Sequence, residues 1–483
     1  MDAEMETEAS GGDARGAAAR GGVAAAAAPQ RAAAAAPRGG GGGAAAAAAA
    51  ALQHPNPAVV IDSGAYMTKV GFSGQAAPAR AMPSVVAREG DRRKFVGDSI
   101  DQCADPSGLT FRRPCEKGYT MNWDVTQELW DRAFAKDVLG LDSAALRDRS
   151  LLVTEPQFNH EPLQDTMDQL VFELYGFSEY HCTTAAMLSD YGHRQTVAGA
   201  GSLASVVVDA GYSFTHAVPI FDATKVNYAV KRVDVGGKIL TNYLAELCQH
   251  REYNLAEETY LVDQIKQVMC YVSSDFSRDM VAARVRGKKN TIKRQFVLPD
   301  YRSNKALGGN RGYVRGDSSR VWRDVRATQP DAELRGPEQE VTLNIERFTV
   351  PELLFNPSDI GYEQGGVVDA CEQAIMALPV DLREPAVGHV LLTGGNALLP
   401  GFAERVEREL RAALPDTLSP LLKVHLLERA DSLGCGEGTQ ADAAWRGGAQ
   451  FAASEEFGRA TVTKEEYEEH GHRLCRLRNL QPG

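Results

Sequence analysis

Two short segments place an aspartate and a glycine directly after an apolar run. Asp62 and Gly64 follow one run of valine and isoleucine, and Asp209 and Gly211 follow a run of three valines. A glycine turn lets backbone N–H groups approach phosphate oxygens closely, because no Cβ intervenes. An aspartate at the end of a strand can hold a hydrated divalent cation beside those phosphates. The two segments therefore predict a phosphate clamp, with Asp62 and Asp209 holding a metal ion through water.

Further residues extend this clamp into a nucleotide site. Lys69 adds a positive charge to the first segment, and Gly394 and Gly395 lie where a predicted strand turns into a helix. Such a turn lets a nucleotide lie against the backbone. Each motif alone is more typical of an ordinary β-turn, so the prediction depends on their occurring together. The predicted cofactor-binding residues are Asp62, Gly64, Lys69, Asp209, Gly211, Gly237, Lys266, Gly394, Gly395 and Asn396, and no residue is predicted to be catalytic.

The elements around the clamp indicate a duplicated α/β fold. Residues 59–70 align without gaps on 206–217, and the two aspartates are 209 − 62 = 147 residues apart. Each copy predicts a buried strand, a turn and a second strand, so the chain is expected to form two similar lobes. Apolar residues at helical spacing over 122–139 and 163–175 follow the first copy, and a buried strand is predicted at 390–393. Strands that alternate with helices are typical of α/β proteins.

Composition limits the class of protein. The 483 residues carry a formal net charge of −12, which argues against a protein that coats nucleic acid with its whole surface. The eight cysteines form no Cys-x-x-Cys pair and are expected to be reduced thiols. No apolar run is long enough to predict a membrane span. Residues 1–57 are low-complexity alanine and glycine with scattered arginine, so a disordered tail is predicted there.

Taken in order along the chain, these motifs resemble those of the actin family, from Ala58 to about Leu474. The Asp-x-Gly segments resemble its two phosphate loops, and the turn at Gly394 resembles its adenosine motif. Further matching blocks are Asn122-Trp123-Asp124, Thr154-Glu155-Pro156, Cys270-Tyr271-Val272, Glu346-Arg347-Phe348, Pro351-Glu352 and Thr463-Lys464-Glu465-Glu466-Tyr467.

The resemblance implies an actin-like fold of two RNase-H-like lobes, each with a small subdomain, around a central nucleotide cleft. It implies an actin-like domain over 58–483. The first lobe would cover about 58–200 plus a C-terminal segment at about 445–475. The second would cover about 201–444, with an insertion at about 301–339.

The chain departs from the family where hydrolysis and polymerisation depend on particular residues. Ala65 and Tyr66 replace a hydroxyl and a small residue after the first glycine, Tyr212 replaces an acid, and Ala185 aligns with the water-orienting glutamine. Losing such a side chain removes much of nucleotide hydrolysis, so we expect little or no ATPase activity. ATP or ADP with Mg²⁺ could remain as a structural ligand, or the cleft could be empty. The filament-contact loop is shortened to residues 89–94, so self-polymerisation is not expected.

Other blocks resemble the nuclear branch of the family found in SWR/SRCAP-type chromatin remodellers. This resemblance implies a structural subunit that docks with a remodeller motor subunit and a small zinc-finger subunit, and meets nucleosomes and histones through the complex. It also implies a nuclear location, with the cytoplasm left open. The alternatives are an actin-like ATP-hydrolysing switch and a cytoskeletal filament-binding protein. The blocks are 105–109, 116–119, 211–216, 235–242 and 356–361.

A basic segment at 284–326 is the main candidate docking arm. It carries 13 basic residues and three acids, a local balance of 13 − 3 = +10. Its interpretation, in order of preference, is a partner-binding arm, a solvated loop, or a patch that contacts nucleosomal DNA phosphates.

Overall fold

The computed structural model describes residues 56–90, 93–103, 106–196, 203–249, 255, 258–299, 312–315, 339–427 and 441–480. The chain divides into two units, 1–40 and 41–483, and all described residues belong to the second. The predicted disordered tail at 1–57 lies outside the described residues except for its last two positions. Within the described part, no helix combines the length and the apolar character that a membrane crossing requires.

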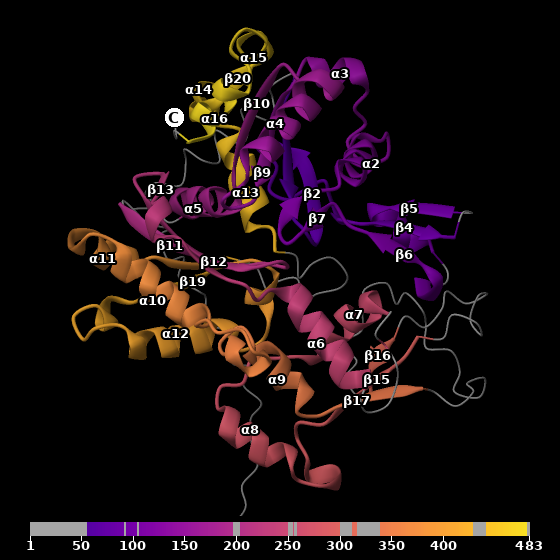
Figure 1. Ribbon diagram of the computed structural model, residues 1–483, viewed down its shortest axis with the longest axis vertical. Helices are drawn as coiled ribbons and strands as arrows, with labels where there is room; N and C mark the ends of the chain where they lie inside the picture. The colour runs from indigo at the N-terminus through magenta and orange to yellow at the C-terminus, as the bar shows by residue number, and fades with distance from the viewer. Residues whose placement is uncertain are drawn as a thin grey trace, which may run out of the picture. The chain divides into compact units, whose positions relative to one another are not determined.

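The first sheet contains the first predicted hairpin at its centre (Figure 1). Its order is β20 (Val462–Thr463), β10 (Glu179–Thr184), β9 (Ser150–Glu155), β1 (Val59–Ser63), β2 (Met67–Phe72) and β3 (Arg80–Pro83). Strand β1 pairs antiparallel with β2 and parallel with β9. Because β1 has neighbours on both edges and is covered on both faces, its apolar run is continuous rather than alternating.

The second sheet repeats this arrangement around the second predicted hairpin. Its order is β13 (Thr224–Lys225), β12 (Thr215–Phe221), β11 (Ala204–Ala210), β18 (Val390–Thr393) and β19 (Val424–Leu426), and β14 (Lys231–Val233) also pairs with β12. Like β1, β11 is flanked by its antiparallel hairpin partner and a parallel strand. Asp62 lies opposite Lys69, and the corresponding Asp209 lies opposite His216. The predicted α/β class and both hairpins are confirmed.

Helices cover both sheets, and two of them correspond to the helical segments predicted at 122–139 and 163–175. The helix at 122–139 ends earlier than predicted, at Phe134, and the segment at 163–175 is α4 continued by a π-helical turn over Leu170–Tyr175. The helices are α2 (Trp123–Phe134), α3 (Ser143–Arg147), α4 (Glu161–Gln169), α5 (Ala185–Thr196), α6 (Gly237–Gln249), α7 (Thr259–Met269), α8 (Phe276–Ala283), α9 (Glu346–Glu352), α10 (Val367–Ala377), α11 (Val380–Val387), α12 (Phe402–Ala413), α13 (Ala443–Phe451), α14 (Glu455–Ala460), α15 (Lys464–His470) and α16 (His472–Leu480).

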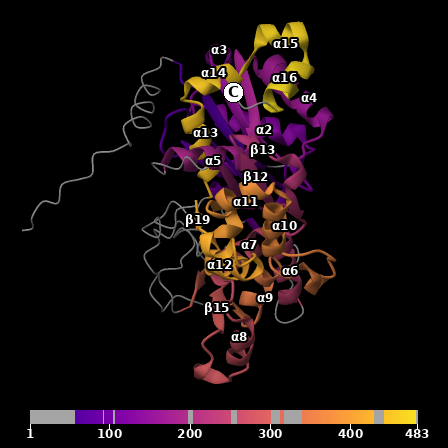
Figure 2. The same ribbon diagram turned by 90° about the vertical axis from the view of Figure 1, so that its left-hand side faces the viewer.

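Helices α5 and α13 pack with their backbones in close contact at Gly447 and Leu188. A Cβ on Gly447 would lie 1.8 Å from the carbonyl oxygen of Leu188, so only glycine fits there. Helix α5 follows directly on β10 of the first sheet and contacts β11 of the second. C-terminal helix α16 contacts α4 and β10. Figure 2 shows α16 beside α4. The C-terminal segment thus returns to the first sheet.

Three small sheets complete the described chain: β4 (Val86–Glu89), β5 (Arg93–Val96) and β6 (Thr110–Arg112); β15 (Arg294–Val297), β16 (Tyr313–Val314) and β17 (Glu340–Leu343); and β7 (Cys115–Glu116) with β8 (Tyr119–Thr120). Glu89 pairs with Arg93, which confirms that the connection in place of the family's filament-contact loop is short. The predicted flanks of the insertion pair with each other through β15 and β17. Strand β16 within the insertion was not predicted, and most of the insertion lies outside the described residues.

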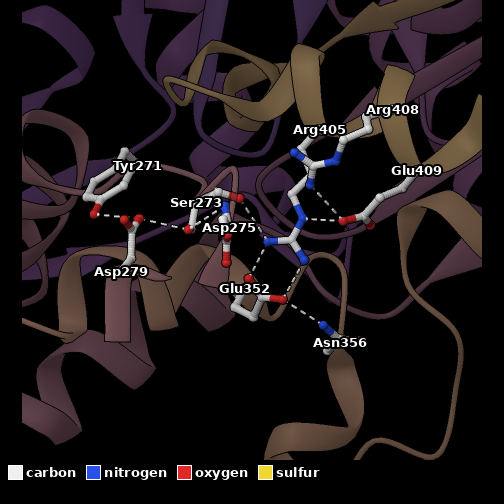
Figure 3. A network of polar contacts seen from close by, with 9 residues as sticks. All are labelled: Tyr271, Ser273, Asp275, Asp279, Glu352, Asn356, Arg405, Arg408 and Glu409. Atoms are coloured by element: carbon white, nitrogen blue, oxygen red, sulfur yellow. Dashed lines mark hydrogen bonds and ion pairs between the residues drawn. The ribbon is translucent and has the colours of Figure 1, made fainter. Parts of the chain in front are cut away.

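A buried polar network joins the segments that carry several family-like blocks (Figure 3). The guanidinium of Arg405 on α12 donates to both carboxylate oxygens of Glu352 on α9, at 2.5 and 2.6 Å, and to the carbonyl oxygen of Ser273 at 3.2 Å. Arg405 and Glu352 are only 7% and 4% exposed. A bidentate pair with this burial fixes α12 against α9.

Candidate functional site

The first hairpin holds its aspartate in an internal ion pair. The carboxylate of Asp62 pairs with Lys69 Nζ at 2.6 Å and accepts a hydrogen bond from Thr154 Oγ1 at 2.9 Å. The same hydroxyl accepts from the backbone N–H of Ser63 at 2.9 Å. Asp62 and Lys69 therefore pair with each other, and both are buried. A Cβ on Gly64 would lie 2.6 Å from the carbonyl oxygen of Met67, so the turn requires glycine.

The second hairpin gathers most of the remaining predicted residues. The carbonyl oxygen of Gly211 accepts from Asn396 Nδ2 at 2.8 Å and from the backbone N–H of Gly237 at 3.1 Å. Gly394 has a φ of +92°, and a Cβ there would lie 2.5 Å from the carbonyl oxygen of Ala210 and 2.8 Å from Asp209 Oδ1. Strand β18 thus ends beside β11.

Lys266 closes this group from helix α7. Its ammonium donates to the carbonyl oxygen of Gly237 at 3.0 Å and to Thr241 Oγ1 at 2.8 Å, and it pairs with Asp263 Oδ1 at 2.7 Å. Lys266 is buried at the start of α6, where Gly237 begins the helix. Gly395, by contrast, starts a short 3-10 helix and has open space around its Cβ position.

The two tyrosines that depart from the family pattern meet between the hairpins. The hydroxyl of Tyr66 donates to Asp263 Oδ2 at 2.5 Å and accepts from Gln267 Nε2 at 2.8 Å. Its ring centroid lies 5.2 Å from that of Tyr212. The guanidinium carbon of Arg113 lies 5.5 Å from the centre of the Tyr66 ring and 5.0 Å from that of Tyr212. Both hairpin turns and α7 are thereby joined by side chains.

Burial and the neighbouring charges favour one protonation state for each of Tyr66 and Asp263. Burial, together with the charge of Asp263, raises the pKa of Tyr66 well above its ordinary value. Burial alone would raise the pKa of Asp263, but Lys266 outweighs that effect and holds it below its usual range. Tyr66 is therefore a protonated donor and Asp263 an ionised acceptor at neutral pH, which is the stronger, charge-assisted form of this hydrogen bond.

Asp263, Gln267 and Arg113 were not among the residues predicted from the sequence. Asp263 precedes Lys266 by three residues on one helix, a spacing that could have suggested their pairing. Arg113 carries no comparable signal, because its contacts are made only in the folded chain.

The match to known proteins agrees with this geometry. Residues 53–479 match the family model described as Actin. The chain belongs to the actin family.

Curated relatives of the chain carry one shared name. Actin-related protein 6 of Drosophila melanogaster is 37% identical over 424 residues, which cover 86% of this chain and 98% of the relative. Actin-related protein 6 of Arabidopsis thaliana is 35% identical over 440 residues, covering 87% and 98%. Actin-like protein ARP6 of Cryptococcus neoformans is 36% identical over 427 residues, covering 87% and 84%.

The actin fold generally binds a nucleotide with a divalent metal. In this chain the backbone turns fit such a ligand, but the side chains around them do not. The tight turns at Gly64 and Gly394 are kept. The cations at the phosphate position are engaged internally, because Lys69 pairs with Asp62 and Lys266 with Asp263. The rings of Tyr66 and Tyr212 occupy the space between the hairpin turns. As arranged, these side chains do not fit a phosphate and metal centre, so no reaction step is assigned to them.

Proposed function

We propose that this actin-family protein is a non-catalytic structural subunit of a nuclear, ATP-dependent chromatin-remodelling complex. That complex would exchange the Z-type variant of histone H-two-A into nucleosomes and so regulate transcription. Support comes from the sequence blocks that resemble nuclear actin-related proteins and from relatives of matching length named actin-related protein 6. The observation that best supports a non-catalytic role is the hydrogen bond from the Tyr66 hydroxyl to Asp263, because it ties the first hairpin turn to helix α7.

The proposed role does not need nucleotide turnover by this chain. In place of a phosphate-binding hydroxyl, an acid and a water-orienting amide, the chain has Ala65, Tyr212 and Ala185. Ala185 begins helix α5 and has no hydrogen-bonding side chain. ATP or ADP with Mg²⁺, if held, would be a structural ligand, and the complex's separate motor subunit would supply the hydrolysis.

The partners in this proposal are the motor subunit and a small zinc-finger subunit, with the nucleosome reached through the complex. The basic segment at 284–326 is the proposed docking arm. In its described part, β15 pairs with β16 and with β17, so the residues on either side of the insertion meet in one small sheet. A segment of this composition can become ordered when it binds a protein partner. A direct contact with DNA phosphates is the less favoured interpretation.

Purification of the tagged full-length chain from nuclear extract, followed by mass spectrometry, tests the assembly. We expect a remodeller motor and a small zinc-finger protein at near-stoichiometric amounts. Recovery of filament proteins without any remodeller motor would contradict the proposal and favour the cytoskeletal alternative.

A single-turnover ATPase assay tests the non-catalytic part. The purified chain is expected to release no phosphate from Mg-ATP above the buffer blank, because Ala185 cannot orient water. Hydrolysis at rates typical of actin would establish the alternative, an ATP-driven switch.

A further inference from the structure

Three histidines converge where helix α5 meets an edge of the second sheet. His193 lies in the last turn of α5, His389 lies directly before β18, and His425 is the central residue of the edge strand β19. The ring centroids are 4.9 Å apart for His193 and His425, 5.8 Å for His389 and His425, and 5.9 Å for His193 and His389. One ring nitrogen from each residue lies within 4.8 Å of the others.

The converging rings have unmet bonding capacity. Nε2 of His193, Nδ1 of His389 and Nε2 of His425 are buried, and none has a hydrogen-bond partner among the residues that the structure describes. His193 is 7% exposed. A buried polar atom without a partner destabilises the fold, and three at one place call for a ligand that would satisfy them together.

The charge state of His193 and His389 suits a cation rather than an anion. Burial, with the neighbouring His425 and His389 rings, lowers the pKa of His193 to about 4. Burial also lowers the pKa of His389, further lowered by His425 and Lys423 and partly offset by Asp190. Neutral imidazoles keep a lone pair for a metal ion.

We propose that His193, His389 and His425 form a binding site for Zn²⁺, with water as the fourth ligand. Three imidazole nitrogens and one open position are a common zinc coordination set, and imidazole favours zinc over magnesium or calcium. Nitrogens bound to tetrahedral zinc at 2.0–2.1 Å lie about 3.4 Å apart, so modest ring rotation closes the present spacing. His389 and His425 are half-buried, which leaves an approach for the ion and its water.

A second group of possible metal ligands in the chain serves as a comparison, because its members bond to neighbouring side chains. Asp165, Asp168 and His472 also lie within ligand distance of one another. There, however, His472 Nδ1 lies 3.1 Å from Asp168 Oδ2, and Arg476 forms an ion pair with Asp165. Its groups satisfy one another, so this cluster ties α16 to α4 and needs no ion.

Zinc at the three histidines would join the two halves of the fold. Helix α5 continues from β10 of the first sheet, whereas His389 and His425 adjoin paired strands β18 and β19 of the second. The bound ion would thus be a structural cross-link between helix α5 and the second sheet. This role does not depend on the proposed assembly partners.

Metal analysis of the untagged full-length protein, purified without chelator, tests the site. We expect about one zinc per chain by elemental mass spectrometry. Removal of one ligand in His193→Asn or His425→Asn should weaken zinc binding by more than about 100-fold, since even outer-shell changes cost 10–100-fold. The matched control His472→Asn changes the self-paired cluster and should keep one zinc per chain.

A spectroscopic readout covers the case in which the His193 variant does not fold. Co²⁺ added to the chelator-stripped wild-type protein should give the intense visible absorption of a four-coordinate site, and Zn²⁺ should abolish it. A weak spectrum like that of hydrated Co²⁺ would overturn the proposal. So would equal zinc content in wild type and folded His425→Asn, or loss of zinc in His472→Asn.

Discussion

The polar residues between the two hairpins are buried, and the three histidines at β18, β19 and α5 each have a buried ring nitrogen, but only the first group is satisfied by the protein itself. Asp62, Lys69, Asp263 and Lys266 all pair within the chain. The unpartnered histidine nitrogens have no such neighbours among the described residues. At the place where the family generally holds a ligand the charged side chains pair with one another, whereas the proposed zinc site, which has no sequence motif, has nitrogens that are free to bind an ion. A ligand should therefore be sought where bonding capacity is unmet, since inherited position alone does not establish occupancy.

The largest expected difference is in the free energy of unfolding that is lost when one side chain of a buried group is replaced. Glu352→Ala should lower the free energy of unfolding by about 3 kcal/mol, because the buried guanidinium of Arg405 loses its bidentate acceptor and keeps one ion pair, with Glu409. In metal-free protein, His425→Asn should cost less than about 1 kcal/mol, because its unpartnered nitrogen makes no hydrogen bond that could be lost. Urea unfolding monitored by circular dichroism measures both.

The control for Glu352 is Glu407→Ala. Glu407 pairs with Arg411 on the same helix, but both side chains are at least 40% exposed. An exposed pair contributes about 0–1 kcal/mol. Similar losses for Glu352→Ala and Glu407→Ala would show that burial does not decide the cost.

The next expected difference concerns the response to ligands. Zn²⁺ at a hundredfold excess over its Kd should stabilise the metal-free wild-type chain by about 2.7 kcal/mol, whereas millimolar Mg-ATP should stabilise it by much less. The reason is that zinc would meet three unpartnered nitrogens, while the lysines between the hairpins are already paired within the chain. Denaturant titrations with each ligand give the two values. Strong stabilisation by Mg-ATP without stabilisation by Zn²⁺ would reverse the comparison.

The two regions also differ in how far the sequence could predict them. The hairpins follow from apolar runs that end in Asp-x-Gly, and Lys69 opposite Asp62 follows from a short antiparallel register. The sequence identifies Tyr66 as unusual, but its bond to Asp263 joins residues 197 positions apart and depends on how α7 packs. The histidines lie on three separate elements without any ligand spacing, so only the register of β18 with β19 and the packing of α5 bring them together.

The smallest expected effect comes from a buried histidine that does have a partner. His181 Nδ1 lies 3.1 Å from the carbonyl oxygen of Ala460, and burial lowers the pKa of His181 to about 4. The unfolded chain, with an ordinary pKa of about 6.5, then binds more protons than the folded chain between pH 6.5 and 4. The free energy of unfolding therefore falls as pH falls through this window, by about 1 kcal/mol between pH 6.5 and 5.5 for this group alone.

His181→Asn should remove that share of the pH dependence, since asparagine can still donate to Ala460 but does not titrate. Burial raises the pKa of Asp168 to about 6, which acts in the opposite direction, but this effect is common to both proteins and cancels in their difference. Urea unfolding at pH 6.5 and 5.5 gives the measurement, with metal-free samples so that zinc release from the three other histidines does not contribute. Parallel pH profiles for wild type and His181→Asn would mean that His181 is protonated equally in both states. The conclusion that burial keeps His193 and His389 uncharged would then be in doubt as well.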